Sequence, residues 1–501
     1  MPMETNRGAP TPPIAFDAEP ASITRHFDTP VVAVDDALLA RLRAACETVL
    51  TDEAATVEAG RDWWPLAMGW ALDGTEPGRA AVVARPSSID EVSAVLALCN
   101  AEQVPVTAAA GRSGVCGASV PLHGGVLLDV TDMAGIVDVD DQSQLLRVRA
   151  GTFGDVLEDD LRLTHNVTLG HWPQSMNLST VGGWLACRSA GQFSTRYGKI
   201  EDMVVGMEVA LADGNVVRTG GPPRAAVGPD LNQVFVGSEG TLGVITEATL
   251  RIHPAPTADR GGAYGFPSFV AGLDACRRIL RRGATPAVLR LYDEAESKRN
   301  FEVGDQCVLL VFDEGDPVLI DAVMAIVTEE CRSAARLDDG LVDQWMHERN
   351  DVSALEALIR REIVVDTIEI AGQWAALGPI YDDVRAAVGG IEHILVVSAH
   401  QSHAYRDGAC LYFTFAGKPP VDQREKFYVA VWDTATRAVL ARGGALSHHH
   451  GVGLNRSRFV REALGPAFDV LLAMKRALDP NGILNPGKLG LPDPFGTVSW
   501  P

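Results

Sequence analysis

The segment that decides the fold is GHWPQSMNLSTVGGWLACRSAGQ, residues 170–192. Two further glycine-containing clusters follow it, RYGKIEDM (196–203) and GSEGTLGVITEATL (237–250). Glycine has no Cβ and lets backbone amides approach a ligand closely, while neighbouring hydroxyl side chains supply further hydrogen bonds. Strand-like runs such as residues 203–211 border these clusters, which argues against a simple linker. The three clusters therefore predict a cradle for a large anionic cofactor.

A further glycine loop lies upstream, AAAGRSGVCGAS at residues 108–119. A dinucleotide-binding fingerprint would need a helix directly after such a loop. Here SVPLHGGVLLDV, residues 119–130, reads as another strand. This excludes a Rossmann nicotinamide site and leaves two interpretations, a ligand-binding loop or a plain turn between two strands.

Composition limits the class of partner. A net charge of −22 argues against nucleic acid or an anionic membrane surface as partner, because binding phosphates needs a basic face. No apolar run reaches the roughly 18 residues of a membrane span, so we expect no integral membrane segment. The eight cysteines are scattered without ligand-like spacing, and the first residues lack a secretory pattern. Free buried thiols and a cytoplasmic location are expected.

The pattern along the chain predicts an α+β protein of several parts. At 501 residues two or three domains are expected. The expected parts are a disordered leader (1–30), a helical lead-in (31–76), a strand-rich domain (77–256), a second domain with an antiparallel sheet (257–440) and a terminal segment (441–501).

Three consecutive histidines, His448, His449 and His450, precede Gly451. Adjacent residues of an extended segment point to opposite faces, whereas a metal site favours helical spacing or histidines on separate strands. We therefore expect no metal here. The histidines are better suited to donating hydrogen bonds and accepting a proton beside an anion or a flavin.

Two further polar residues have a structural and a functional interpretation. Tyr412, in the strand-like LYFTF, either packs in the core or presents its phenol to a pocket as a proton carrier. Arg290 lies at the end of a strand, where it either pairs with Asp293 or holds the anionic group of a substrate.

Seven blocks carry a resemblance to a known family. They are PVTAAAGRSGVCG (105–117), GHWPQSMNLSTVGGW (170–184), RYGKIEDMVVG (196–206), GPDLNQVFVGSEGTLGVITEATLRIHP (228–254), SHAYRDGACLYF (402–413), SHHHGVG (447–453) and DPNGILNPGKLG (479–490). In this order they resemble the FAD-linked oxidase family, which has the vanillyl-alcohol oxidase or p-cresol methylhydroxylase type of fold. The SHAYRDGACLYF and SHHHGVG blocks resemble its alkylglycerone-phosphate synthase branch. D-lactate and glycolate dehydrogenases share the cofactor blocks.

The resemblance implies a two-subdomain FAD-binding domain of the p-cresol methylhydroxylase type at 77–256. The resemblance also implies an antiparallel-sheet cap over 257–440 and a C-terminal segment that returns to the FAD domain. The implied FAD contacts are Thr107, Ala108, Ala109, Ala110, Gly111, Arg112 and Ser113 in the pyrophosphate loop; His171, Gln174, Ser175, Met176, Asn177, Leu178, Ser179, Thr180 and Gly183; Cys187, Arg188, Ser189 and Ala190; and Glu239, Gly240, Thr241, Leu242, Gly243, Val244 and Ile245. No histidine lies in the pyrophosphate loop, so noncovalent FAD is expected.

In the synthase branch, Tyr412 matches the proton-transfer tyrosine, Arg290 a substrate-side arginine, and His448, His449 and His450 the essential histidine block. The cap lacks the branch's Tyr-Leu-Arg-Asp segment, whose arginine binds substrate phosphate, so Arg349, Arg360 or Arg361 would have to replace it. The resemblance implies a small-molecule substrate with an anionic group, and a homodimer is the family's usual form.

Three functions follow from the sequence. The first is synthase-like flavin N5 chemistry with proton transfer by tyrosine and histidine and no net redox change. The second is an FAD-dependent dehydrogenase or oxidase of a 2-hydroxy acid or an alcohol. The third is a flavin-binding protein that has lost catalysis.

Overall fold

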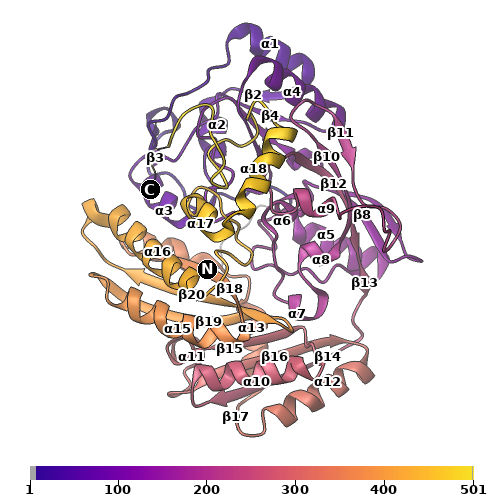
Figure 1. The fold of residues 1–501 in the computed structure, drawn as a ribbon, viewed down its shortest axis with the longest axis vertical. Coiled ribbons are helices and arrows are strands. Elements are labelled where there is room, and N and C mark those ends of the chain that lie inside the picture. Colours follow the sequence, from indigo (N-terminus) through magenta and orange to yellow (C-terminus); the bar gives the residue numbers. More distant parts are fainter. Residues whose placement is uncertain (1–6, 499, 501) are drawn as a thin grey trace.

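The computed structural model describes residues 7–498 and 500. Its first half forms the upper body in Figure 1 and its cap lies below, and the last helices, drawn in yellow, lie against the upper body. A four-stranded and a five-stranded sheet organise the upper body, and a seven-stranded sheet organises the cap. The two sheets of the upper body form its two subdomains.

The four-stranded sheet holds the first glycine loop. Its strands, in spatial order, are β2 (Thr48–Leu50), β4 (Val82–Arg85), β6 (Val126–Asp129) and β5 (Val106–Ala109). Helix α4 (Ile89–Glu102) begins after Ser88, whose side chain caps the helix by accepting a hydrogen bond from the amide of Glu91. No helix separates β5 from β6 in this described region, so the glycine loop does lead into a strand.

The lead-in differs from the expected helical segment. Residues 31–76 contain α1 (Asp36–Ala45), α2 (Glu53–Ala59) and α3 (Pro65–Leu72), but also β2, which pairs antiparallel with β4. Its three residues are too few to interrupt a helical pattern in the sequence. Their strand conformation is set by the neighbouring sheet edge.

The expected disordered leader is wrong for residues 7–30. Strand β1 (Thr24–Arg25) pairs with β3 (Thr75–Glu76), and the side chains of Ile14 and Phe27 are buried. These apolar side chains hold the leader against the body despite its proline-rich composition. Residues 1–6 lie outside the described residues.

The five-stranded sheet is antiparallel and holds the other glycine clusters. Its strands are β11 (Val216–Arg218), β10 (Val204–Ala210), β12 (Val244–Arg251), β8 (Leu145–Arg149) and β7 (Ile136–Asp140). Helix α6 (Val181–Cys187) begins at Thr180, whose Oγ1 accepts a hydrogen bond from the amide of Gly183. The GSEGTLG loop leads directly into β12.

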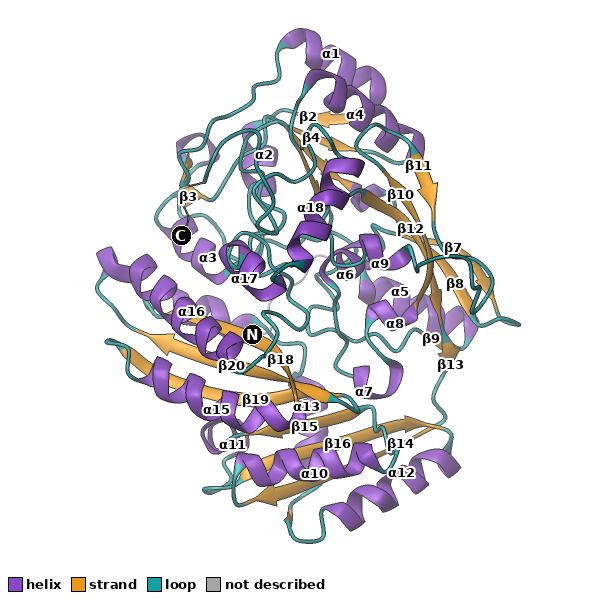
Figure 2. Ribbon diagram, viewed as in Figure 1, coloured by secondary structure: helices purple, strands orange, loops and turns teal. Residues whose placement is uncertain are grey.

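The cap is built on a fully antiparallel sheet, as its strand pattern predicts. In spatial order its strands are β17 (Ala335–Arg336), β14 (Ala258–Phe266), β16 (Cys307–Gly315), β15 (Val288–Tyr292), β19 (Ile394–Ala404), β20 (Gly408–Gly417) and β18 (Val364–Gln373). Helices α10 (Phe269–Arg281), α12 (Pro317–Glu330), α15 (Trp374–Gly389) and α16 (Arg424–Ala441) lie along one face (Figure 2). Alternation along β20 sends Leu411 and Phe413 into the core beneath these helices and Tyr412 to the opposite, inner face.

The C-terminal segment returns to the upper body, as expected. The amide of Val106 donates to the carbonyl of Ile483 at 2.8 Å, and the amide of Asn485 donates to the carbonyl of Val106 at 2.8 Å. Helix α18 (Ala467–Leu478) contributes Lys475, whose ammonium donates to the carbonyl of Thr241. The chain end therefore ties β5 to the GSEGTLG loop.

Within residues 7–498 and 500, no helix combines the length and hydropathy that a bilayer span requires.

Candidate active site

A cavity of about 820 Å³ lies between the glycine loops of the upper body and the inner face of the cap sheet. Its volume falls in the upper part of the range usual for ligand sites. Most of the sequence-predicted cofactor residues line it: Ala108, Ala109, Ala110, Gly111, Arg112, Ser113, Gln174, Ser175, Leu178, Ser179, Thr180, Gly183, Cys187, Ser189, Ala190, Glu239, Gly240, Gly243, Val244 and Ile245. Segments far apart in the sequence thus share one cavity.

Seven of the predicted cofactor residues do not line the cavity: Thr107, His171, Met176, Asn177, Arg188, Thr241 and Leu242. His171 is buried, with its Nε2 3.3 Å from Ser189 Oγ, and burial lowers its pKa to about 3. Met176 and Leu242 pack in the hydrophobic core of the five-stranded sheet. The side chains of His171, Met176 and Leu242 pack behind the loops. A sequence motif does not distinguish such residues from those that line the cavity.

The loops of the upper body meet so closely that glycine is required. A Cβ at Gly111 would overlap the carbonyl oxygen of Leu178, so the first glycine loop packs directly on the second. Gly240 has a left-handed φ of 72°. The lining combines backbone amides, serine and threonine hydroxyls and the guanidinium of Arg112, a donor set that fits a large ligand with anionic oxygens.

On the cap side, Arg290 projects from β15 into the cavity. Its Nε donates to Tyr292 Oη at 2.7 Å, and its Nη2 lies 2.7 Å from His400 Nε2. The alternative of a salt bridge to Asp293 is wrong, because that carboxylate instead accepts the amides of Glu296 and Ala399. In the described chain Arg290 has no carboxylate partner.

His400 completes this part of the site. Burial and the nearby Arg290 lower the pKa of His400. With Arg290 donating to Nε2, the ring is neutral and donates from Nδ1 to Glu296 Oε2 at 2.7 Å. Its ring stacks on Tyr412, with centroids 4.9 Å apart.

Tyr412 lines the cavity. Of its two interpretations, core packing or a phenol presented to a pocket, the structure supports the second. Its Oη lies 3.2 Å from His450 Nε2 and 3.2 Å from Thr367 Oγ1. Burial raises the pKa of the Tyr412 phenol, and burial lowers the pKa of His450 to about 4 although Glu369 opposes that shift. At neutral pH both groups are therefore uncharged, a phenol donor beside an imidazole acceptor.

Glu369 of β18 holds the histidine segment in place. Its carboxylate accepts the amides of His448 at 2.9 Å and His450 at 2.6 Å, and also the guanidinium of the fully buried Arg456 at 3.2 Å. His450 Nδ1 lies 3.5 Å from the same carboxylate. The segment consequently curls around one charge and is not extended.

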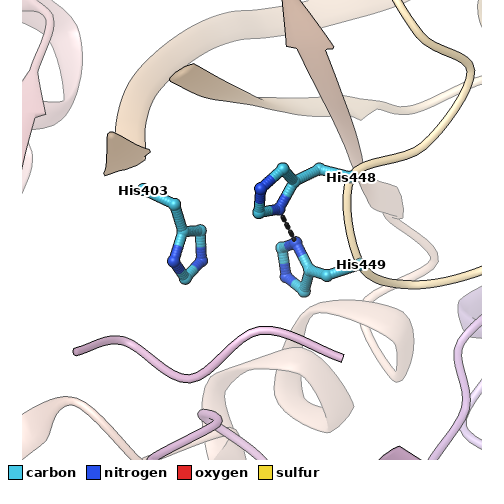
Figure 3. A group of neighbouring side chains, drawn as sticks. All are labelled: His403, His448 and His449. Atoms are coloured by element: carbon cyan, nitrogen blue, oxygen red, sulfur yellow. Dashed lines mark hydrogen bonds between the residues drawn. The ribbon is translucent and has the colours of Figure 1, made fainter. Parts of the chain in front are cut away.

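This curl brings two of the three consecutive histidines together with His403, while His450 lies outside the group, so the three consecutive histidines do not converge as one set. One ring nitrogen of each of His403, His448 and His449 lies within 4.8 Å of the other two (Figure 3). His448 Nδ1 and His449 Nδ1 are 3.0 Å apart. Burial holds the pKa of all three well below the usual range, which leaves neutral imidazoles, the form that binds cations.

The outer nitrogens of this cluster are also fixed. His403 Nδ1 lies 2.8 Å from the hydroxyl of Ser194, in α7 (Ser194–Tyr197), and His448 Nε2 lies 3.0 Å from Tyr405 Oη. Such outer partners orient imidazoles in metal sites. The cluster is able to hold a divalent cation or to accept a proton.

Several residues of the site were not predicted from the sequence: Glu296, His400, His403, Glu369 and Arg456. His400 and His403 are three apart, so strict alternation would place them on opposite faces of β19. A register shift between Gln401 and His403 brings both to the cavity side. No sequence signal marks this bulge, although AHQSHAY (399–405) places His400 just before the quoted block and His403 within it.

Only one of the three candidate replacement arginines reaches the cavity. Arg349 lines it, whereas Arg360 is exposed and paired with Glu356 at 2.8 Å. Arg361 is exposed and does not line the cavity.

Known proteins share both halves of this architecture. Residues 80–220 match the FAD binding domain family, and residues 255–489 match the C-terminal domain of FAD linked oxidases. An uncharacterized FAD-linked oxidoreductase of Escherichia coli, YgcU, is 33% identical over 438 residues, which cover 83% of this chain and 90% of that protein. The alkyldihydroxyacetonephosphate synthase of Dictyostelium discoideum is 29% identical over 450 residues, 81% of this chain and 73% of that protein.

Solved structures of other proteins have the same overall fold. A structure of alkyldihydroxyacetonephosphate synthase superposes with a TM-score of 0.78 at 25% identity, covering 95% of this chain and 89% of that one. p-Cresol methylhydroxylase shares the fold, with a TM-score of 0.73 at 18% identity over 92% of this chain and 99% of that one. The chain therefore belongs to the FAD-linked oxidase family, with an FAD-binding domain of the p-cresol methylhydroxylase type and a C-terminal cap that carries the large antiparallel sheet.

Proposed function

We propose that this protein is a flavoenzyme of the alkylglycerone-phosphate synthase type, in which Tyr412 and His450 transfer a proton at a substrate with an anionic group. The observation that carries the proposal is the hydrogen bond of 3.2 Å between Tyr412 Oη and His450 Nε2, in a cavity that glycine loops share with Arg290. A phenol and a neutral imidazole form a proton-transfer pair without any change in net charge.

FAD would lie against the glycine loops that line the cavity, with Arg112 and the hydroxyls of Ser113, Ser179 and Thr180 toward its phosphates. When bound, FAD supplies a ring whose N5 can react at a substrate carbon or accept a hydride. We propose that it is held noncovalently. Acid precipitation should release all of the flavin into the supernatant, and flavin that stays with the precipitate would contradict this.

The chain's own residues have distinct tasks in this reaction. Arg290 binds the anionic group of the substrate, since its guanidinium faces the cavity without a carboxylate partner. Tyr412 donates or accepts the proton, and His450 exchanges it. Glu369 keeps the histidine segment curled so that His450 reaches the phenol.

The synthase assignment has a direct test. Purified holoenzyme is mixed with acyl-dihydroxyacetone phosphate and a long-chain alcohol, and ether product is measured by mass spectrometry. Formation of the ether with release of the fatty acid supports the assignment. Absence of ether from FAD-loaded protein removes it.

A second candidate is an oxidoreductase that acts on a 2-hydroxy acid or an alcohol. The converging imidazoles of His403, His448 and His449 favour it, because they offer a neutral base or a divalent cation to a substrate hydroxyl. Anaerobic bleaching of the flavin spectrum by a 2-hydroxy acid would support this function and count against the synthase. Comparison of EDTA-treated and zinc-supplemented protein tests the role of a cation.

A further inference from the structure

The histidine segment (448–453) is held by two carboxylates, one from each half of the molecule. Its first part is fixed by Glu369 of the cap, which accepts the amides of His448 and His450. Its last two amides are bound by Glu239, in the GSEGTLG loop of the upper body. Since this loop also lines the cavity, the segment connects the cap sheet to a loop that would hold FAD.

The carboxylate of Glu239 is used entirely by the backbone of this segment. Its Oε1 accepts the amide of Val452, and its Oε2 accepts the amide of Gly453 at 2.8 Å. The side chain is buried, and neither Arg456 nor Lys488, the two cations that act on it, forms an ion pair with it in the described chain. A buried carboxylate is costly unless its oxygens are hydrogen-bonded, and here two backbone amides supply those bonds.

Two glycines of the segment make this close contact possible. Gly451 has a left-handed φ of 80°, and a Cβ on it would lie 2.3 Å from Glu239 Oε1. Gly453 has a φ of 53°, and a Cβ on it would lie 2.2 Å from the carbonyl oxygen of Cys116, in the first glycine loop. The amide of Leu454 donates to the same carbonyl at 2.8 Å. The end of the segment is therefore seated on two of the loops that line the cavity.

Glu239 itself has a backbone conformation that disfavours its residue type. Its φ is 50°, in the left-handed region where a Cβ is crowded. The amide of Glu239 donates to the carbonyl of Ala186 at 3.0 Å, and its carbonyl accepts the side-chain amide of Asn485, so the conformation is fixed from both sides. Such a residue in the wall of a cavity indicates a task beyond filling space.

The family resemblance implies that Glu239 contacts FAD, but its hydrogen bonds favour a different task. Each of its oxygens already accepts an amide of the histidine segment. The amide of His450, bound by Glu369, precedes that of Val452 by two residues, so the two glutamates together fix the backbone that carries the His450 ring. Tyr412 and Glu369 belong to the cap sheet, and Glu239 relates their proton-transfer partner to the cofactor loops.

We infer that Glu239 is a positioning residue, which ties the histidine segment to the cofactor loop, so that the order of the segment around His450 follows the occupancy of that loop by FAD. This rests on the proposed function, since it concerns the proton pair of the same site. A ligand that steadies the loop also steadies the backbone bound to it, and this coupling is lost with the carboxylate. Glu239 does not itself exchange the proton.

Hydrogen–deuterium exchange, read by mass spectrometry on peptides covering residues 447–456, tests the inference without a substrate. In the wild type, saturation with FAD should slow exchange of the Val452 and Gly453 amides about tenfold or more relative to the apoprotein. In Glu239→Gln one of these amides faces the new NH2 group and loses its acceptor, so exchange in the apoprotein should be about tenfold faster or more. FAD should no longer slow it. An equal effect of FAD on both proteins, or no effect on either, overturns the inference.

Turnover separates positioning from a purely structural role. At saturating FAD, Glu239→Gln should lower kcat about tenfold to a hundredfold and leave KM nearly unchanged, because a displaced His450 affects proton transfer and not the substrate contacts of Arg290. Glu239→Asp keeps a carboxylate that can accept both amides and should recover part of the loss. An unchanged kcat, or a change confined to KM, contradicts the positioning role.

A matched control and a second variant complete the design. Glu247→Gln is the control, since Glu247 lies further along β12, outside the cavity lining, and pairs with Arg147 at 3.0 Å. It should behave as wild type in both measurements. Should Glu239→Gln not fold, Gly451→Ala decides the question, because its added Cβ overlaps Glu239 Oε1 and breaks the same contact from the other side.

Failure of the inference and failure of the proposed function give different results. Absence of turnover with every candidate substrate removes the proposed function, whereas the exchange rates still decide whether Glu239 couples the segment to FAD. Exchange that responds neither to FAD nor to Glu239→Gln removes the inference, whereas formation of the ether product would still uphold the proposed function.

Discussion

At the scale of single residues, the site is a set of groups whose neutral forms are stabilised by burial. Tyr412 contacts His450 through its hydroxyl and stacks on His400, and neither Tyr412 Oη nor His450 Nε2 has a charged partner. The charges lie one contact further out, on Glu369 and Glu296. Proton transfer in such a site does not require a charge to be created in a dry environment.

Replacement of the phenol tests its role. Tyr412→Phe keeps the ring and its stacking on His400 but removes the hydroxyl that contacts His450. We expect turnover to fall by about 10²–10⁴-fold with FAD content unchanged, because a positioned proton donor contributes that much. Tyr264→Phe, on the cap strand away from the cavity, is the matched control. Undiminished turnover in Tyr412→Phe would exclude the assigned role.

The buried histidines also predict a loss of stability in acid. The folded-state pKa of His450 is lowered from 6.5 to about 4 by burial, so between these values the unfolded chain binds more protons than the folded protein. Stability is therefore complete above about pH 6.5 and declines as the pH falls toward 4. For His450 alone the full decline corresponds to about 3 kcal/mol. His403, His448 and His449 shift in the same direction.

The measurement is the melting temperature between pH 8 and pH 4 of the wild type and of His450→Asn. The comparison is needed because buried carboxyls such as Asp62 and Asp366, whose pKa is raised to about 7, gain stability over the same range as the pH falls. Relative to the variant, the wild type should lose stability as the pH falls below about 6.5. Parallel curves for the two proteins would mean that the His450 imidazole is solvated in the folded protein.

At the scale of elements, a carboxylate in the middle of β18 shapes the histidine segment. Glu369 accepts two backbone amides, the hydroxyl of Ser447 at 2.8 Å and the guanidinium of Arg456, all of them buried or nearly so. The side chains of His448 and His449 converge because their backbone is fixed in this way. Sequence reasoning treated the segment as extended because a distant carboxylate leaves no local signal.

Glu369→Gln should therefore be strongly destabilising. It leaves the fully buried Arg456 without its counter-charge, which costs about 3–5 kcal/mol in the free energy of unfolding. The double variant Glu369→Gln/Arg456→Met removes both charges and should recover much of this loss. Chemical denaturation of the three proteins measures it. If the single variant loses less than the double variant, the pair is not a mutually dependent ion pair.

Regular elements were predictable from the sequence, and irregular ones were not. The N-cap of α4 at Ser88 and the antiparallel cap sheet follow from local patterns. The short β2 and the bulge that aligns His400 with His403 depend on neighbouring strands. Family blocks located the cofactor loops, but only the folded chain separates lining residues such as Ser179 from supporting ones such as Met176.

At the scale of the whole molecule, the C-terminal segment links two loops of the cavity wall. Asn485 donates from its side-chain amide to the carbonyls of Ala118 at 2.9 Å and Glu239 at 2.7 Å. These carbonyls belong to two different glycine loops of the cavity wall. The same residue pairs through its backbone with Val106 of β5. The C-terminal segment thus sets the spacing between the loops that would hold FAD.

Asn485→Ala should loosen that spacing. It removes two hydrogen bonds and places alanine at a φ of 42°, which together cost about 2–3 kcal/mol in the free energy of unfolding. Because the two loops move independently once this link is lost, the dissociation constant of FAD should rise in parallel. Asn481→Ala is the matched control, since Asn481 bonds to Asn100 on the far side of the same segment. FAD titrations of both apoproteins decide the matter: equal affinities for Asn485→Ala and Asn481→Ala would mean that the chain end stabilises the fold without shaping the cofactor site.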